Sequence, residues 1–158
     1  MNENLEVELL SKQFINKYDM DRTIRRVIKY MQYYKKLEMQ TASEISLLTS
    51  KDFSQIYVDH SSTHSNGVYD QIDKMIDAER EYNEMSYLLS IVNKKMTAEE
   101  KAYFSIIFRD MKSEYVASKI IGRSHNGLKS IRNSCALKVA LAIGKEVLKN
   151  DPPYDDED

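Results

Sequence analysis

The chain has 158 residues, 42% hydrophobic and 30% charged, with a formal net charge of −2, four glycines and two prolines. So few helix breakers favour an all-α fold of one large or two small domains over a turn-rich β fold. No apolar stretch approaches the roughly 20 residues of a membrane helix, the acidic start MNENLEVELL has no signal-peptide pattern, and the single cysteine excludes an internal disulfide and a cysteine-rich zinc site. We therefore expect a cytoplasmic protein without a membrane partner.

The first part of the chain predicts two amphipathic helices. Residues 4–17 read as a short helix, and residues 20–40 form a stronger one, in which apolar side chains recur at helical spacing. Thr41-Ala42-Ser43-Glu44 has the spacing of a capping box and predicts a new helix start. Residues 50–58 fit a short helix or an extended segment, and the Ser- and Asn-rich run 61–67 predicts a loop.

Residues 22–36 carry six basic side chains and no acidic one. This stretch fits a second DNA contact or partner surface, or else a solvated face that complements the acidic segment 70–84, and the second interpretation is favoured.

A long amphipathic helix is expected over residues 68–95. Its apolar residues alternate in spacings of three and four, as in a helix seam: Met75, Ala78, Tyr82, Met85, Leu89, Val92 and Met96. Packing against the N-terminal helices is the favoured interpretation, and a homodimer seam is the alternative. We place the domain junction here, with an N-terminal helical region over 1–95 and a second domain over 96–150.

The second domain opens with another capping box, Thr97-Ala98-Glu99-Glu100, which predicts a helix from about residue 98 to Asp110. Residues 112–134 then fit a helix-turn-helix. Ser118 is the expected small residue where the helices cross, Gly122 takes the turn, and Ser124 caps the second helix. An ordinary helical hairpin with a solvated basic face is the alternative.

Residues 110–149 carry eight Lys or Arg against three acids, which favours a polyanion as partner. The second helix exposes polar side chains suited to base edges in a major groove, and neighbouring residues are suited to phosphates. The expected DNA-binding residues are Lys112, Lys119, Arg123, Ser124, His125, Asn126, Lys129, Ser130, Arg132 and Asn133. Gly127 lacks a side chain and lets the backbone approach DNA closely.

The same helix is expected to continue to residue 149, with an apolar face that ends at Val147 and packs on the helix beginning at Ala98. Cys135 on this helix is expected to be a buried core thiol. Residues 151–158, with five acids and no base, predict a disordered acidic tail.

Other side chains point to no chemistry. His60 and His64 lie in the serine-rich loop without a third ligand at metal spacing, and Asp70, Asp73 and Asp77 fit a solvated helix face. No nucleophile motif, phosphate loop or carboxylate pair appears. We therefore expect no catalytic residues, no metal and no cofactor.

Residues 96–148 resemble region 4 of bacterial sigma factors. More closely, residues 89–147 resemble phage late-gene regulators of the ArpU type and, more loosely, of the RinA type, with IIGRSHNGLKSIRNSCALKVA and the helix start TAEEK as the marks. The resemblance extends weakly to residues 61–79. It implies binding upstream of late promoters, in a bacterial host cell, and activation of packaging or morphogenesis genes.

The expected function is sequence-specific recognition of double-stranded promoter DNA by residues 124–133, with host RNA polymerase as a candidate partner. A homodimer and a protein inhibitor are further candidates. The alternative is a sigma-like module that contacts RNA polymerase or a regulatory protein without specific DNA binding.

Overall fold

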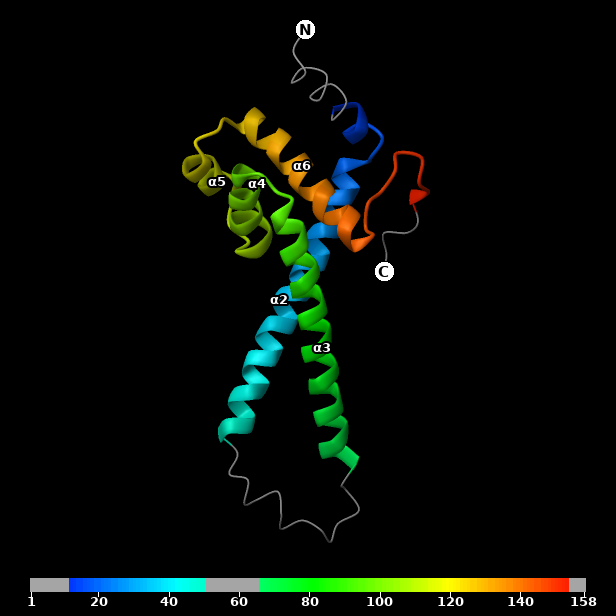
Figure 1. Ribbon diagram of the computed structural model, residues 1–158, viewed down its shortest axis with the longest axis vertical. Coiled ribbons are helices and arrows are strands. Elements are labelled where there is room, and N and C mark those ends of the chain that lie inside the picture. The colour runs from blue at the N-terminus through cyan, green and yellow to red at the C-terminus, as the bar shows by residue number, and fades with distance from the viewer. Residues whose placement is uncertain (1–11, 51–65, 154–158) are drawn as a thin grey trace. The chain divides into compact units, whose positions relative to one another are not determined.

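The computed structural model describes residues 12–50 and 66–153, and the side chains of 12–42 and 69–153. The predicted all-α fold is confirmed: within these ranges the only β interaction is an isolated bridge between Tyr18 and Leu148. No helix in the described part of the chain has both the length and the apolar character needed to cross a membrane. The elements are α2 (Met20–Ser50), α3 (Asn66–Lys94), α4 (Ala98–Tyr103), the π-helix η2 (Phe104–Arg109), α5 (Glu114–Ile121) and α6 (His125–Ile143) (Figure 1).

The chain divides into two compact units. One contains Met1–Met31 together with Leu88–Asp158, and the other contains Gln32–Tyr87. This division differs from the single boundary at residues 95 and 96 that we expected from the sequence. The difference arises because the start of the chain packs on its C-terminal part through contacts that are distant in sequence.

Those long-range contacts join residues 19–23, around the start of α2, to Val147 in the segment that follows α6. The Asp19 amide donates to the Val147 carbonyl at 2.8 Å, and the Val147 amide donates to Thr23 Oγ1 at 3.1 Å. Thr23 and Val147 are fully buried. An unpaired backbone amide or carbonyl at Val147 would be costly in this buried environment. The Asp19 amide pairs with the carbonyl, and the Thr23 hydroxyl is the acceptor for the amide. No local sequence pattern indicates either contact.

Helix α2 is longer than predicted, because the expected helix start at Thr41 does not occur. Thr41 lies inside α2, and its hydroxyl donates to the Leu37 carbonyl at 2.9 Å and the Glu38 carbonyl at 3.0 Å. A threonine inside a helix can bond back to the preceding turn instead of capping a following one. The predicted helix 4–17 lies mostly outside the described residues, as do residues 51–65.

Helix α3 begins at Asn66, two residues before the predicted start, so the end of the predicted loop is helical. Of the predicted seam, Ala78, Met85, Leu89, Val92 and Met96 are buried within the single chain. In the unit formed by Gln32–Tyr87, the ring of Tyr34 stacks on that of Tyr82 at a centroid distance of 5.1 Å, and the Tyr34 hydroxyl lies 2.9 Å from Ser86 Oγ. Intramolecular packing, the favoured interpretation, therefore holds for this stripe.

The predicted helix start at Thr97 is confirmed. Thr97 Oγ1 accepts from the Glu100 amide at 3.3 Å, and α4 begins at Ala98. The helical segment ends at Arg109, next to the expected end at Asp110, but its last six residues form the π-helix η2, and the Asp110 amide after it donates to the Ser105 carbonyl. The wider helix buries Phe104, Ile106 and Phe108 together, and no sequence signal announced it.

Helix α6 ends earlier than predicted. Gly144 adopts a left-handed conformation and closes the helix, so Val147 is buried from the segment that follows and not from the helix itself. The predicted packing of α6 on α4 is confirmed by the Cys135 thiol, which donates to the Glu100 carbonyl at 3.7 Å. Cys135 is fully buried, as expected, and burial raises the pKa of its thiol to about 12.

Two nearly identical motifs with different structural outcomes give a paired test. Thr97→Ala is expected to lower the free energy of unfolding by about 1 kcal/mol, because it removes the only side-chain cap of α4. Thr41→Ala is the matched control and should change it by less than about 0.5 kcal/mol, since alanine is the better residue inside a helix. Urea denaturation of both variants measures the difference. Equal losses would contradict the assignment of Thr41 to a helix interior.

Candidate nucleic-acid interface

The connection between α5 and α6 is short and has a defined conformation. Gly122 ends α5 with φ of 74° and ψ of 31°, a left-handed conformation that favours glycine, and its amide donates to the Ser118 carbonyl at 2.9 Å. The Ser118 hydroxyl donates to the Arg123 carbonyl at 2.8 Å. These two hydrogen bonds tie the turn to the last turn of α5.

Ser118 therefore does not have the role predicted for it. Its neighbour Ala117 is fully buried and is the small residue on the inner face of α5, whereas Ser118 is half-buried and holds the turn. A single-residue shift in the expected register explains the difference. Leu128 is buried on the inner side of α6, and Ile121 and Ile131 are half-buried.

The predicted cap at the start of α6 is confirmed. Ser124 has an extended backbone conformation, and its hydroxyl accepts from the Gly127 amide at 3.3 Å. A methyl group added at Gly127 would lie 3.4 Å from Arg123 Cβ and 3.6 Å from Ser124 Oγ, which are ordinary contacts. The fold therefore does not require glycine at this position.

The first two turns of α6 place most of the predicted contact residues in solvent. Ser124, His125, Asn126, Lys129 and Ser130 are exposed, and Asn133 is half-buried. This polar side of α6 is opposed by an inner side that packs in the core through Leu128, Cys135 and Ala136. The structure thus brings the predicted polar residues together on one exposed side of a supported helix.

Glu114 organises this region, although the sequence did not single it out. Its Oε1 atom accepts from Arg132 Nη1 at 3.0 Å and from the Tyr103 hydroxyl at 3.2 Å, and its Oε2 atom lies 3.6 Å from His125 Nδ1. Burial and the Glu114 charge raise the pKa of Tyr103 far above its usual range, so the hydroxyl remains a donor. One carboxylate therefore links α4, α5 and α6.

Arg132 was expected to be an exposed contact residue, but its side chain is mostly buried and paired with Glu114. Only a quarter of its side chain is exposed, and its guanidinium is held by Glu114. A bidentate contact with a base edge would require it to leave a partly buried carboxylate. Arg132 therefore supports α6 internally, and the exposed candidates for base contacts are His125, Asn126, Lys129 and Ser130.

Two more cations of the basic stretch are also paired with acids. Arg123 Nε and Nη2 donate to Glu99 Oε1 at 3.0 and 2.8 Å, and Lys138 Nζ lies 2.9 Å from Glu100 Oε2. The Arg123–Glu99 pair is largely exposed, so a phosphate can compete for the guanidinium at little cost. Lys138 is held at the buried Glu100 and belongs to the α4–α6 contact.

The remaining predicted phosphate contacts lie at α5. Lys112 and Lys119 are exposed, and Lys119 Nζ lies 4.6 Å from the ring centroid of Tyr115. The Tyr115 side chain is itself 67% exposed. An exposed aromatic ring with a cation over it was not predicted, although the i, i+4 spacing of the two residues signals it.

The basic segment of α2 and the acidic tail meet through Arg22. Its guanidinium donates to the Asp151 carbonyl at 3.2 Å and the Pro152 carbonyl at 2.9 Å. The first residues of the predicted disordered tail therefore have defined contacts, and residues 154–158 lie outside the described range. Tyr33 of α2 donates to Glu81 of α3 at 2.8 Å, a contact between the two segments that involves none of the six basic side chains.

Within the described residues, no three His, Cys, Asp or Glu side chains gather in a way that could hold a metal ion. His60 and His64 lie outside those residues, and Asp70, Asp73 and Asp77 are exposed on α3 as expected. Comparison with protein-family models, curated proteins and solved structures finds no match to this chain.

The Glu114 cluster gives a stability test. Glu114→Ala is expected to lower the free energy of unfolding by about 1–3 kcal/mol, because it leaves the Arg132 guanidinium and Tyr103 hydroxyl without their acceptor. Glu99→Ala is the matched control: it removes the exposed pair with Arg123 and should cost less than about 1 kcal/mol. Denaturant unfolding compares the two, and a larger loss for Glu99→Ala would contradict the proposed hierarchy.

Proposed function

We propose that this protein is a sequence-specific DNA-binding transcription regulator, in which α5 and α6 form a helix-turn-helix like that of sigma region 4. The observation that carries the proposal is the construction of α6. One side is packed in the core, the start is capped by Ser124, and the other side exposes Asn126, Lys129 and Ser130. A helix supported on one side and polar on the other suits insertion into a major groove.

Phosphate contacts fall to residues on both sides of the α5–α6 turn. Lys112, Lys119 and Arg123 are exposed, and Ser124 places its hydroxyl at the N-terminus of α6, where amide groups favour an anion. We assign these residues to positioning on the DNA backbone, and the first turns of α6 to reading base edges. The assignment to activation of phage late genes rests on the sequence resemblance over residues 89–147.

A second candidate function is protein contact without specific DNA binding, as in a sigma-like module that binds RNA polymerase. It is favoured by Tyr115 and Ile120 on α5, whose side chains are 67% and 63% exposed. Salt separates the two functions. Each neutralised phosphate steepens the dependence of log affinity on log salt by roughly 0.9, so three contacts give a slope near −3, whereas protein contacts give a shallow one.

The first test is a mobility-shift titration with Lys129→Ala on short duplexes tiled across the neighbouring genomic DNA, at two salt concentrations. Loss of a base contact is expected to cost about 1–3 kcal/mol on the preferred duplex. Lys145→Ala is the matched control, since this exposed lysine lies beyond the far end of α6, about 27 Å from its start. The absence of any preferred duplex, or equal losses for both variants, would contradict the proposed function.

Gly127 provides a test in which stability and affinity change in opposite directions. Gly127→Ala is expected to raise the free energy of unfolding by about 0.5–1 kcal/mol, because alanine favours the helix and its methyl group meets only ordinary contacts. On the preferred duplex the same methyl group should reduce affinity by about tenfold, through loss of the close backbone approach. Denaturation and mobility-shift titration measure the two effects, and unchanged affinity would place this turn away from the DNA.

A further inference from the structure

Helix α3 carries a second stripe of large side chains, on the side opposite its buried stripe. Tyr69, Ile72, Ile76 and Tyr87 are exposed, with Ile76 at 57% and Tyr87 at 68%. Their spacings of three, four and eleven residues keep them on one helix face, about 170° from the face that carries Ala78 and Met85. Large apolar side chains exposed on one helix face indicate an interaction surface.

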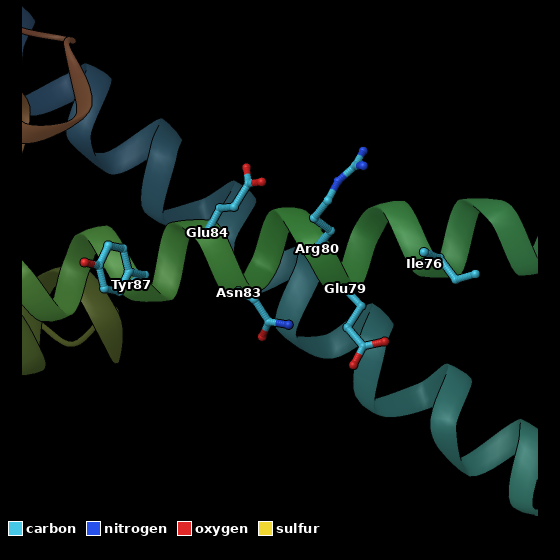
Figure 2. Close-up of a pocket in the computed structure, with 6 residues that line it drawn as sticks. All are labelled: Ile76, Glu79, Arg80, Asn83, Glu84 and Tyr87. Atoms are coloured by element: carbon cyan, nitrogen blue, oxygen red, sulfur yellow. The ribbon is translucent and has the colours of Figure 1, made fainter.

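The middle of this stripe is polar. Between Ile76 and Tyr87 lie Glu79, Arg80, Asn83 and Glu84, and together these six residues line a shallow depression along α3 (Figure 2). Figure 2 shows Ile76 and Tyr87 at the two ends of the row, with Arg80 and Glu84 extending toward the same side of the helix. An apolar residue therefore flanks a charged centre at each end.

This pattern is complementary to itself when one copy is reversed. In an antiparallel pair centred between residues 81 and 82, Ile76 of each copy meets Tyr87 of the other. In this register Arg80 of each copy lies level with Asn83 and one residue from Glu84 of the other, and Glu79 lies level with Glu84, which extends from the opposite side of the helix (Figure 2). A parallel pair in register would bring Arg80 level with Arg80, Glu79 with Glu79 and Glu84 with Glu84, which makes three like-charge pairs against two in the antiparallel pair, and juxtaposed like charges are costly.

We propose that the stripe formed by Ile76, Glu79, Arg80, Asn83, Glu84 and Tyr87 pairs with the same stripe of a second copy in an antiparallel, two-fold symmetric dimer. Arg80 is available for this contact: its pair with Asp77, at 3.1 Å, is about two-thirds exposed and contributes little. The interface is isologous, so each contact occurs twice. It uses none of the residues assigned to DNA binding, and its failure would leave that proposal untouched.

The first experiment measures the mass of the full chain by sedimentation at concentrations up to roughly 100 μM, where a micromolar Kd gives mostly dimer. Ile76→Glu is expected to raise the dimer Kd by about tenfold or more, because it removes the apolar contact with Tyr87 at both ends of the interface. Met39→Glu is the matched control, because it places the same charge at an exposed apolar residue of α2 and should leave the Kd unchanged.

Charge exchange then tests the orientation. Arg80→Glu and Glu84→Arg should each weaken the dimer, because like charges then meet at both symmetry-related contacts between positions 80 and 84. Mixing the two single variants should restore association as a heterodimer. The glutamate at position 80 of one chain then faces the arginine at position 84 of the other, and the native Glu84 of the first chain faces the native Arg80 of the second. No effect on helix stability within one chain can produce rescue on mixing.

A monomer at every concentration would overturn the proposal, as would a dimer that Ile76→Glu leaves unchanged. Dimerisation that is weakened by both single charge variants but not restored by mixing would overturn the antiparallel arrangement. Circular dichroism of Ile76→Glu checks that the helical content is retained, as expected for a substitution at an exposed position.

Discussion

The carboxylate of Glu114 is the interaction on which the candidate interface depends most. It stands in the first turn of α5, where the helix dipole favours a negative charge, and accepts hydrogen bonds from Arg132 of α6 and Tyr103 of α4. Burial and the charge of Glu114 raise the pKa of Tyr103, so its hydroxyl remains a donor even at an alkaline pH at which an exposed tyrosine would ionise. Three helices are thus oriented around one charged group, and the exposed side of α6 is presented by that arrangement.

The same network explains why counting charges along the sequence overstates the positive surface. Arg123, Arg132 and Lys138 each have an acidic partner, and two of those partners, Glu99 and Glu100, lie on α4 outside the basic stretch. What remains for a polyanion is a smaller set of exposed lysines beside a polar helix start. Recognition on such a surface depends on the position of a few side chains more than on net charge.

Short sequence motifs predicted helix starts and turns correctly where the interaction that forms them involves only neighbouring residues. The cap at Thr97 and the turn at Gly122 each depend on atoms within five residues, and both occur where the sequence placed them. Thr41 carries nearly the same motif as Thr97 and does not cap, because the preceding helix continues and supplies carbonyl acceptors to its hydroxyl. Whether a capping-box sequence starts a helix therefore depends on whether the preceding residues are already helical.

Contacts distant in sequence account for most of what could not be predicted. The bond from the Val147 amide to Thr23 links residues 124 positions apart, and no periodicity indicates it. The partners of Arg123 and Arg132 are likewise set by how α4 and α5 pack. The candidate site could thus be located from its spacing, whereas the division of its cations between structural and contact roles required the packing.

Symmetry connects the two surfaces inferred for this chain. A single recognition helix contacts only a few base pairs, which is too little to select one operator among many competing sites. An antiparallel pair of α3 helices relates two copies by a two-fold axis, and a palindromic duplex has the same symmetry. The stripe on α3 and the exposed side of α6 share no residue and lie largely in different compact units. The proposed dimer and the proposed recognition helix therefore do not compete for the same side chains, and a dimer would present two copies of α6 to a palindromic site.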